Sequence, residues 1–343
     1  MGSNVVTIKQ IALQAGVSIA TVSMALRRSP KIRAATAERV REIARDLGYT
    51  PNPLVSALMA RIRESAPSQD QVAIAAIYLG DDERRAPNTA FLAEIFAGAQ
   101  ERAERLGFRL ALFRSREKGL SERRLRDILL SRGIYGLMVL PSSDLGLKLE
   151  LDWGQFAAVA IGYSLVEPAL HRVVPDHFQE LSVAFERLGR LGYRRIGLLM
   201  DTGTDLRVRH KWAALLEWHN GRIDPSDRVP LSLVPEITRD AFLRWFEQHR
   251  PDVVLSPRQW VVDWMEAEGL QLPRDVGFAH LNWTERSAPC SGIDQRAGLL
   301  GAAAVESVVA QLHRNERGLP TVAQSLAIEG VWIDGPTTRD RSR

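Results

Sequence analysis

The stretch Val17-Ser18-Ile19-Ala20-Thr21-Val22-Ser23-Met24-Ala25-Leu26 decides the fold of the first part of the chain. Ser18 can cap a helix, and the apolar residues at helical spacing behind it are Val22, Ala25 and Leu26. A helix also precedes this stretch, because Thr7 and Gln10 have the spacing of a capping box and Gly16 can end the helix. Two helices joined by a short glycine turn predict a helix-turn-helix.

The outer face of the second predicted helix carries no charge, and its residues are Ile19, Ala20, Thr21, Ser23 and Met24. No acidic residue lies between Gly16 and Arg33. A surface that approaches phosphates lacks carboxylates, because they would repel the DNA backbone. Thr21 and Ser23 can donate to phosphate oxygens, and the three apolar residues can touch base edges and thymine methyl groups. The alternative is a small three-helix domain without a DNA partner.

A third helix is expected over residues 34–47, with Gly48 as its end. The following segment, Gly48-Tyr49-Thr50-Pro51-Asn52-Pro53, cannot be helical throughout, since each proline moves its predecessor out of the α region. Residues 54–63 can form a short helix, which alone in water would be marginally stable.

The run from Thr7 to Leu58 resembles the N-terminal headpiece of the LacI/GalR family of bacterial transcription repressors. The matching residues are Thr7-Ile8, Ala12, Ala15-Gly16-Val17-Ser18, Ala20-Thr21-Val22-Ser23, Leu26, Thr36, Arg39-Val40, Leu47-Gly48-Tyr49, Pro51-Asn52-Pro53 and Leu58. The resemblance implies that residues 54–61 form a hinge helix that folds on the operator, with Leu58 as the wedge in the minor groove. We therefore expect DNA contacts from Thr7, Ser18, Ile19, Ala20, Thr21, Ser23, Met24, Arg27, Asn52 and Leu58.

Two positions depart from this family pattern. Met24 stands where the family usually has an arginine that reads a base, and methionine offers only apolar contact. We therefore do not carry over the usual half-site preference. Val55-Ser56 stands where Ala-Arg is common, which removes one positive charge beside the groove.

Charge is unevenly distributed along the 343 residues, whose formal net charge is +4. Residues 1–63 hold ten Lys/Arg and three Asp/Glu, a net charge of +7, which leaves −3 for the remainder. This concentration is typical of a nucleic-acid-binding head on a nearly neutral body. The length predicts two or three compact units, and the 45% hydrophobic and 25% charged content is that of a soluble globular protein.

Several classes of protein are not expected. Cys290 is the only cysteine, so the chain has neither an internal disulfide nor a CxxC metal site, and we expect no cofactor and no metal. The N-terminus lacks the pattern of a signal peptide, and no apolar run approaches 18 residues. These features predict a cytoplasmic protein without a membrane partner. Neither a nucleophile elbow nor a glycine-rich phosphate loop is present, so we do not expect an enzyme.

From residue 72 onward, buried strands alternate with helices, which predicts parallel sheets covered by helices on both faces. The first set of strands is expected at residues 72–79, 108–113, 135–140 and 156–161, with helices at 90–106 and 121–131. The alternation restarts near Asp176, with helices at 177–191, 206–219, 238–249 and 259–269 and strands at 192–200, 229–234, 252–255 and 276–280. A long helix at 295–314 and a strand near 325–333 close the chain.

This second part resembles the effector-binding core of the same family, which shares its fold with periplasmic sugar-binding proteins. The expected fold is a small all-α helix-turn-helix headpiece followed by a two-lobed α/β core of two doubly wound parallel sheets, periplasmic-binding-protein-like, type I. The expected divisions are a headpiece at 1–50, a hinge helix at 51–63, a linker at 64–71, a core at 72–335 and a tail at 336–343. Crossings between lobes are implied near residues 171, 291 and 325, so that lobe 1 covers about 72–171 and 292–323 and lobe 2 covers about 172–291 and 324–335.

The cleft between the lobes is the expected effector site. The candidate residues are Asn88, Phe91, Arg209, Arg258, Trp260, Asn282 and Trp283. Arg209 matches the family's ligand-clamping arginine, whereas Asn282 replaces a usual aspartate and Pro257-Arg258 replaces a usual Asn-Asp pair. Loss of carboxylates and gain of Arg258 favour an anionic or less hydroxylated ligand, so the effector is expected to be a sugar or an anionic metabolite.

Three functions stay open from the sequence. The first is a homodimeric repressor that binds a double-stranded DNA operator under the control of a small-molecule effector. The second is a DNA-binding regulator whose cleft no longer binds ligand. The third is a solute-binding protein with a vestigial headpiece, which the intact cap, turn and wedge residues disfavour.

Overall fold

The structure, a computed structural model, describes residues 8–26, 33–47, 72–80, 89–114, 121–285, 287 and 289–341. One compact unit contains the headpiece helices and another contains the strands that follow. The expected hinge and linker, at residues 51–63 and 64–71, lie outside the described residues.

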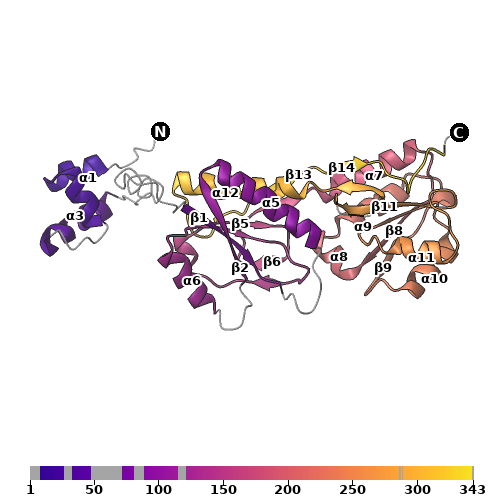
Figure 1. The fold of residues 1–343 in the computed structure, drawn as a ribbon, viewed down its shortest axis with the longest axis horizontal. Coiled ribbons are helices and arrows are strands. Elements are labelled where there is room, and N and C mark those ends of the chain that lie inside the picture. The colour runs from indigo at the N-terminus through magenta and orange to yellow at the C-terminus, as the bar shows by residue number, and fades with distance from the viewer. Residues whose placement is uncertain are drawn as a thin grey trace. The chain divides into compact units, whose positions relative to one another are not determined.

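The headpiece consists of α1 (Ile8–Ala15), α2 (Ile19–Leu26) and α3 (Ala34–Asp46) (Figure 1). Its buried residues come from all three helices: Ile11, Ala12, Ala15, Val22, Ala25, Ala37, Val40 and Ala44. Gly16 adopts the left-handed conformation, with φ of +62°, between α1 and α2. The helix-turn-helix predicted from the apolar spacing and the glycine is therefore confirmed.

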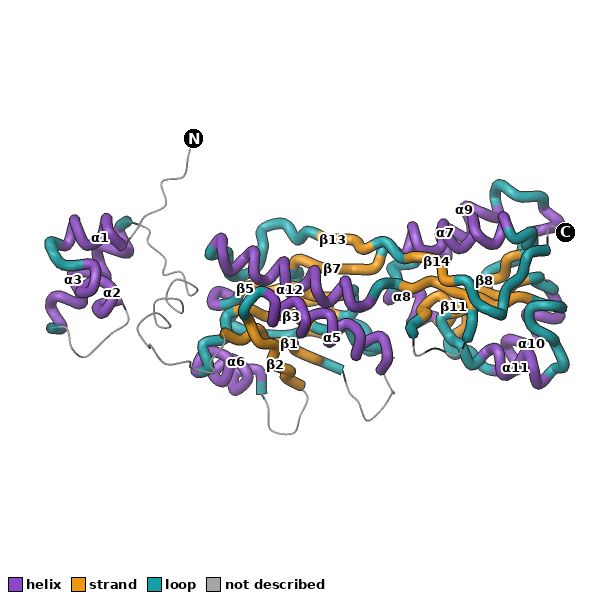
Figure 2. Tube along the Cα trace, turned by 45° about the horizontal axis from the view of Figure 1, so that its top comes forward, coloured by secondary structure: helices purple, strands orange, loops and turns teal. Residues whose placement is uncertain are grey.

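Lobe 1 of the core contains one six-stranded parallel sheet in the order β13-β7-β5-β3-β1-β2 (Figure 2). Its elements are β1 (Val72–Tyr78), α5 (Thr89–Arg105), β2 (Phe108–Arg114), α6 (Glu122–Ser131), β3 (Gly136–Val139), β4 (Leu147–Lys148), the 3-10 turn Trp153–Gln155, β5 (Ala157–Ile161), β6 (Leu165–Glu167), β7 (His171–Pro175), α12 (Ala297–Arg314) and β13 (Ser325–Ile328). The short strands β4 and β6 pair with each other.

Lobe 2 contains a second six-stranded sheet, in the order β14-β12-β11-β10-β8-β9, in which only the β12–β14 pair is antiparallel. Its elements are α7 (His177–Arg190), β8 (Ile196–Asp201), α8 (Thr202–Arg207), α9 (Lys211–Asn220), the 3-10 turn Pro225–Asp227, β9 (Ser232–Val234), α10 (Arg239–His249), β10 (Val253–Ser256), α11 (Val261–Ala267), β11 (Gly277–Trp283), β12 (Ser291–Asp294) and β14 (Val331–Ile333). The predicted fold class is confirmed.

Successive strand residues in lobe 2 enter two different cores. Leu198 and Met200 of β8 pack with residues of α7 and α9, whereas Leu199 between them packs with residues of α10 and α11. Because side chains alternate across a strand, a sheet with helices on both faces needs apolar residues at every position. This requirement explains the unbroken apolar runs in the sequence.

The chain crosses between the lobes three times, and each crossing comes a few residues later than expected. β7 belongs to the lobe-1 sheet, so the first crossing follows Pro175 rather than residue 171. β12 belongs to lobe 2, so the second crossing follows Asp294 rather than residue 291. β13 pairs with β7, whereas β14 pairs with β12, so the third crossing lies between Ile328 and Val331 rather than near 325.

The helix expected over residues 206–219 is two helices. Arg209 and His210, between α8 and α9, both have positive φ, at 58° and 59°. The apolar spacing alone does not reveal this break, because no glycine or proline marks it.

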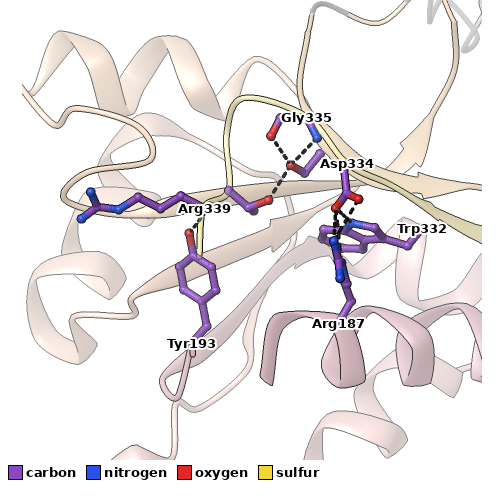
Figure 3. A network of polar contacts seen from close by, with 8 residues as sticks. Arg187, Tyr193, Trp332, Asp334, Gly335 and Arg339 are labelled. Carbon is purple, nitrogen blue, oxygen red and sulfur yellow. Dashed lines mark hydrogen bonds and ion pairs between the residues drawn. The ribbon is translucent and has the colours of Figure 1, made fainter. Parts of the chain in front are cut away.

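The last described residues are not a free tail but part of lobe 2 (Figure 3). Arg187 of α7 pairs with Asp334, which also accepts a hydrogen bond from the indole of Trp332 at 2.7 Å. The Arg339 backbone N–H donates to the Tyr193 hydroxyl at 3.2 Å. Thr337 is buried, and its hydroxyl donates to the Phe278 carbonyl at 2.8 Å. These bonds fasten residues beyond 335 to the sheet.

Two helices of lobe 1, α5 and α12, approach so closely that only glycine fits between them. A Cβ added at Gly301 would lie 1.9 Å from the Ile95 carbonyl oxygen, and one added at Gly98 would lie 2.1 Å from the Gly298 carbonyl oxygen. Both contacts are to backbone atoms, which cannot rotate away.

We therefore expect Gly301→Ala to lower the free energy of unfolding by about 1–3 kcal/mol, through overpacking of this helix pair. The matched control is Gly189→Ala in α7, where a Cβ meets nothing within 4 Å. Alanine there should be neutral or stabilising by up to about 1 kcal/mol, since it favours helix more than glycine. Urea unfolding of both variants measures the difference, and equal midpoints would contradict the prediction.

Candidate functional site

The N-terminus of α2 is built around Ser18. Its Oγ accepts the Thr21 backbone N–H at 3.0 Å and lies 2.9 Å from Thr21 Oγ1. Arg39 of α3 donates to the Ala15 carbonyl at 3.0 Å and so fixes the end of α1. These bonds cap the start of α2 and tie the end of α1 to α3.

The other predicted DNA contacts are described only in part. Ile19, Ala20, Ser23 and Met24 belong to α2, but their side chains lie outside what the structure describes. The remaining predicted positions, Thr7, Arg27, Asn52 and Leu58, lie outside the described residues altogether.

A cavity of about 740 Å³ lies between the two lobes of the core. Its lobe-1 wall follows the carboxyl ends of β3 and β5 and includes Ser143 and Tyr163. Its lobe-2 wall follows the ends of β8 and β10 and includes Asp201 and Arg258. This is the place where ligands bind in open parallel sheets.

An ion pair crosses the lobe-2 wall of the cavity. Arg258 Nη2 lies 2.8 Å from Asp201 Oδ2. The other carboxylate oxygen, Oδ1, accepts the Thr204 backbone N–H at 2.7 Å, and Oδ2 accepts the Thr204 hydroxyl at 3.0 Å. Burial raises the pKa of Asp201, but the charge of Arg258 and the bonds from Thr204 outweigh it, and the net shift is downward. Asp201 is therefore ionised at neutral pH and matches the charge of Arg258.

The second arginine in the wall is Arg207. Its Nη2 donates to the Thr204 hydroxyl at 2.8 Å, and its Nη1 donates across the cleft to the Ser143 carbonyl at 3.2 Å. Among the described residues, the Asp, Glu, Lys and Arg side chains that line the cavity are two acids and two bases: Asp201, Glu236, Arg207 and Arg258. The formal charges of these four residues cancel.

His177, Trp212 and Asn282 also line the cavity. His177, the first residue of α7, lies with Nδ1 2.9 Å from the buried Glu180 carboxylate. The rings of His177 and Trp212 make an edge-to-face contact, with their centroids 5.3 Å apart. Two polar atoms of the lining, Trp212 Nε1 and Asn282 Oδ1, are buried and have no hydrogen-bond partner among the described residues. A buried donor and a buried acceptor of the lining residues are therefore left without a hydrogen bond among the described residues.

The structure brings some of the predicted effector residues together and separates others. Phe91, Arg258, Trp260 and Asn282 line the cavity. Asn88 lies outside the described residues. Arg209 and Trp283 are not among the lining residues. The Arg209 guanidinium lies over the Tyr163 ring, 4.9 Å from its centroid, and the Trp283 indole donates to the Cys290 carbonyl at 3.1 Å within lobe 2.

Sequence reasoning missed the main polar residues of the cavity, which are Asp201, Thr204, Arg207, His177 and Trp212. Arg209 was chosen because it matches the family's ligand-clamping arginine, whereas Arg207, two residues earlier, is the arginine that lines the cavity. The positions of Asp201 and His177, each directly after a predicted strand or crossing, were the available signal.

No helix among the described residues is long and apolar enough to cross a membrane. Within the same ranges, the His, Cys, Asp and Glu side chains form no group of three or more that could hold a metal ion.

The fold and the headpiece together define a class: a helix-turn-helix headpiece joined to a two-lobed, periplasmic-binding-protein-like core. Residues 7–52 match the family described as "Bacterial regulatory proteins, lacI family". This match confirms, for the headpiece, the resemblance expected from the sequence.

The chain is similar to the maltose regulon regulatory protein MalI of Escherichia coli, with 29% identity over 62% of this chain and 60% of that protein. It thus aligns with about three fifths of that relative. Two solved structures share the fold: the transcriptional regulator CelR–cellobiose complex, at 19% identity and a TM-score of 0.56, and the lac repressor dimer bound to operator and the anti-inducer ONPF, at 18% and 0.55. Each of the two alignments covers 97% of this chain and 99% of the other. All three of these proteins are named as regulators or repressors.

His280 lies in β11 beside the cavity and generates a pH prediction. It is buried, and its Nε2 lies 3.2 Å from the Pro257 carbonyl. Burial lowers the pKa of His280 to about 4, the nearby Arg258 lowers it further, and the bond to Pro257 opposes the shift. As the pH falls below about 6.5, the unfolded chain takes up a proton that the folded protein cannot accept until about pH 4.

Folding stability is therefore lost across this window, by about 1.4 kcal/mol per pH unit from this residue. His280→Gln removes the titration, so the variant should lose less stability than the wild type between pH 7 and pH 4.5. Urea unfolding at both pH values measures the two slopes. Parallel slopes would contradict the burial of a neutral His280.

Proposed function

We propose that the protein is a sequence-specific DNA-binding transcriptional repressor that binds a two-fold symmetric operator as a homodimer. The observation that carries this proposal is the packed helix-turn-helix, with its Ser18 cap and acid-free recognition segment, in a headpiece that matches the LacI family. The sequence adds a net charge of +7 in residues 1–63. Phosphate contacts from such a head supply affinity, and α2 supplies base contacts.

Dimerisation and the hinge belong to the same proposal. One headpiece makes few contacts, and two-fold pairing doubles them on a symmetric site. The lac repressor, which shares the fold, is a dimer bound to operator in its solved structure. Residues 54–61 would form the hinge helix, with Leu58 pressed into the minor groove.

We propose further that a small molecule binds in the interlobe cavity and controls DNA affinity. The supporting observation is the pair of unpartnered buried atoms, Trp212 Nε1 and Asn282 Oδ1, in a cavity of about 740 Å³. Buried polar atoms are usually hydrogen-bonded, so in a regulator whose cleft no longer binds ligand we would expect both atoms to have partners within the protein. Two proteins that share the fold are in complex with small molecules, cellobiose in one and the anti-inducer ONPF in the other.

The charges of the described lining residues favour a neutral ligand over the anion that Arg258 alone suggested. Arg258 is neutralised by Asp201, and Arg207 is committed to the Thr204 hydroxyl and the Ser143 carbonyl. An anion would have to displace a carboxylate or be buried beside it, and both cost free energy.

The DNA proposal is tested by selecting bound sequences from a random duplex library with the full-length protein. We expect an enriched two-fold symmetric site whose half-sites report what α2 reads. Val40→Asp is the control, because it puts a charge into the headpiece core and should abolish enrichment while leaving the core folded. Only nonspecific retention at low salt would overturn the proposal.

The ligand proposal is tested by thermal unfolding with glucose and cellobiose against glucose 6-phosphate. A ligand at a concentration 100-fold above its Kd stabilises the folded state by about 2.7 kcal/mol. We expect stabilisation by a neutral sugar and none by the phosphate. Asp201→Asn should reverse this preference, because it leaves Arg258 uncompensated. Stabilisation of the wild type by the phosphate alone would contradict the proposed ligand class.

A further inference from the structure

A short segment of lobe 2, residues 207–211, reaches across the cleft to lobe 1. Arg207 Nη1 donates to the Ser143 carbonyl at 3.2 Å, and Lys211 Nζ donates to the Tyr163 hydroxyl at 3.2 Å. The Arg209 guanidinium and the Lys211 ammonium also lie over the Tyr163 ring, 4.9 and 5.3 Å from its centroid. Arg207, Arg209 and Lys211 of lobe 2 thus contact two sites of lobe 1, which are the Ser143 carbonyl and Tyr163.

The backbone of this segment is arranged to make these contacts together. In a continuous helix Arg207 and Lys211 would share one face, and Arg209 would lie on the opposite face. The structure instead places Arg209 and His210 in the left-handed region, at φ of 58° and 59°, which side chains with a Cβ rarely adopt. This turn brings Arg209 and Lys211 over the same tyrosine.

Asp205 makes two bonds to His210 in the strained turn. Nδ1 of His210 lies 2.6 Å from Asp205 Oδ2, and the His210 backbone N–H donates to the Asp205 carbonyl at 2.9 Å. Asp205 is buried, whereas the His210 side chain is 63% exposed. Strained residues that are held by their surroundings concentrate at ligand clamps and switches, which makes this turn a candidate for a moving part.

A continuous chain of bonds connects the segment to the cavity. Arg258 pairs with Asp201 at 2.8 Å, and Asp201 accepts the Thr204 hydroxyl at 3.0 Å. The Thr204 hydroxyl oxygen accepts Arg207 Nη2 at 2.8 Å, and Arg207 Nη1 ends the chain at Ser143 of lobe 1. Arg258, Asp201, Thr204 and Arg207 all line the cavity.

We propose that residues 207–211 are a latch that holds the lobes closed, and that the Arg258–Asp201 pair connects the cavity contents to this latch. A group that draws Arg258 away from Asp201 frees the carboxylate to move, which moves the Thr204 hydroxyl and loosens Arg207 from Ser143. A neutral ligand that leaves the pair intact keeps the latch closed. The latch itself needs neither ligand nor DNA, and only its response to cavity contents rests on the proposed function.

The latch is tested by measuring the distance between spin labels on the two lobes of the full-length protein, without ligand or DNA. Labels are attached at Glu150→Cys in lobe 1 and Asp240→Cys in lobe 2, both exposed, while Cys290 is buried. We expect the labelled protein to give mainly one distance. Tyr163→Leu should increase the population at a second distance about fivefold to tenfold, because it removes the acceptor and the ring together.

Two matched controls separate the latch from general loosening. Tyr135→Leu removes a tyrosine whose ring lies under Arg317 at 4.9 Å within lobe 1, so it should leave the distance distribution unchanged. Tyr163→Phe keeps the ring and loses only the bond from Lys211, so its effect should be intermediate. An unchanged distribution in Tyr163→Leu would overturn the latch.

The connection to the cavity is tested in the same assay with Arg258→Gln and Arg207→Gln. Both should increase the second population, and the double variant should show less than the product of the two effects, since they act through one chain of bonds. Arg228→Gln, which removes an arginine bonded to the Ile223 carbonyl elsewhere in lobe 2, is the control. The proposed connection between cavity and latch would be overturned if Arg258→Gln left the second population unchanged. It would also be overturned if the effects of Arg258→Gln and Arg207→Gln multiplied in the double variant. Failure of DNA selection would leave these distances unaffected, so the two proposals fail separately.

Discussion

The core depends on one buried joint, where the three crossings between the lobes meet. Glu180 of α7 follows the first crossing and is 1% exposed. Gln295, from the second crossing, donates to its carboxylate at 3.3 Å, and Gly330, from the third, packs so closely that a Cβ would lie 2.8 Å from Glu180 Cγ. Burial raises the pKa of Glu180, and the hydrogen bond from His177 opposes the rise. A buried carboxylate is tolerated only with such partners, which makes the joint specific in its geometry.

The joint and the cavity share residues, and this explains how cavity contents can affect lobe geometry. His177 and Gln295 line the cavity and contact Glu180. Gln179, the residue before Glu180, makes two hydrogen bonds with the Gly330 backbone, at 3.1 and 3.4 Å. A molecule that contacts His177 therefore touches a side chain that is hydrogen-bonded to Glu180 in the buried joint. The proposed latch at residues 207–211 lies at another part of the same cavity wall. Hinged closure of two lobes would involve both the joint and the latch.

The sequence predicted what periodicity and local chemistry determine, and missed what long-range pairing determines. Gly16, Ser18 and the apolar spacing were enough for the headpiece helices, and Ser121 and Thr238 cap α6 and α10 at the expected starts. The position of the cleft was predicted from the carboxyl ends of the strands. The crossing points could not be predicted in the same way, because residues 325–333 have one apolar pattern but belong to two sheets. The family match pointed to Arg209, and the left-handed turn at Arg209 and His210, which no glycine marks, could not be predicted from the sequence.

The headpiece has little apolar material with which to stabilise itself. Of the eight buried core residues in the described part of the headpiece, five are alanines, and the larger ones are Ile11, Val22 and Val40. Small side chains bury little area, and burial is the main favourable term in folding. Its net positive charge adds self-repulsion, which bound phosphates would relieve. Under the proposed function, DNA that binds only the folded headpiece stabilises it by mass action. Headpiece stability and DNA affinity are then linked, and a change such as Met24→Arg would alter both base recognition and self-repulsion.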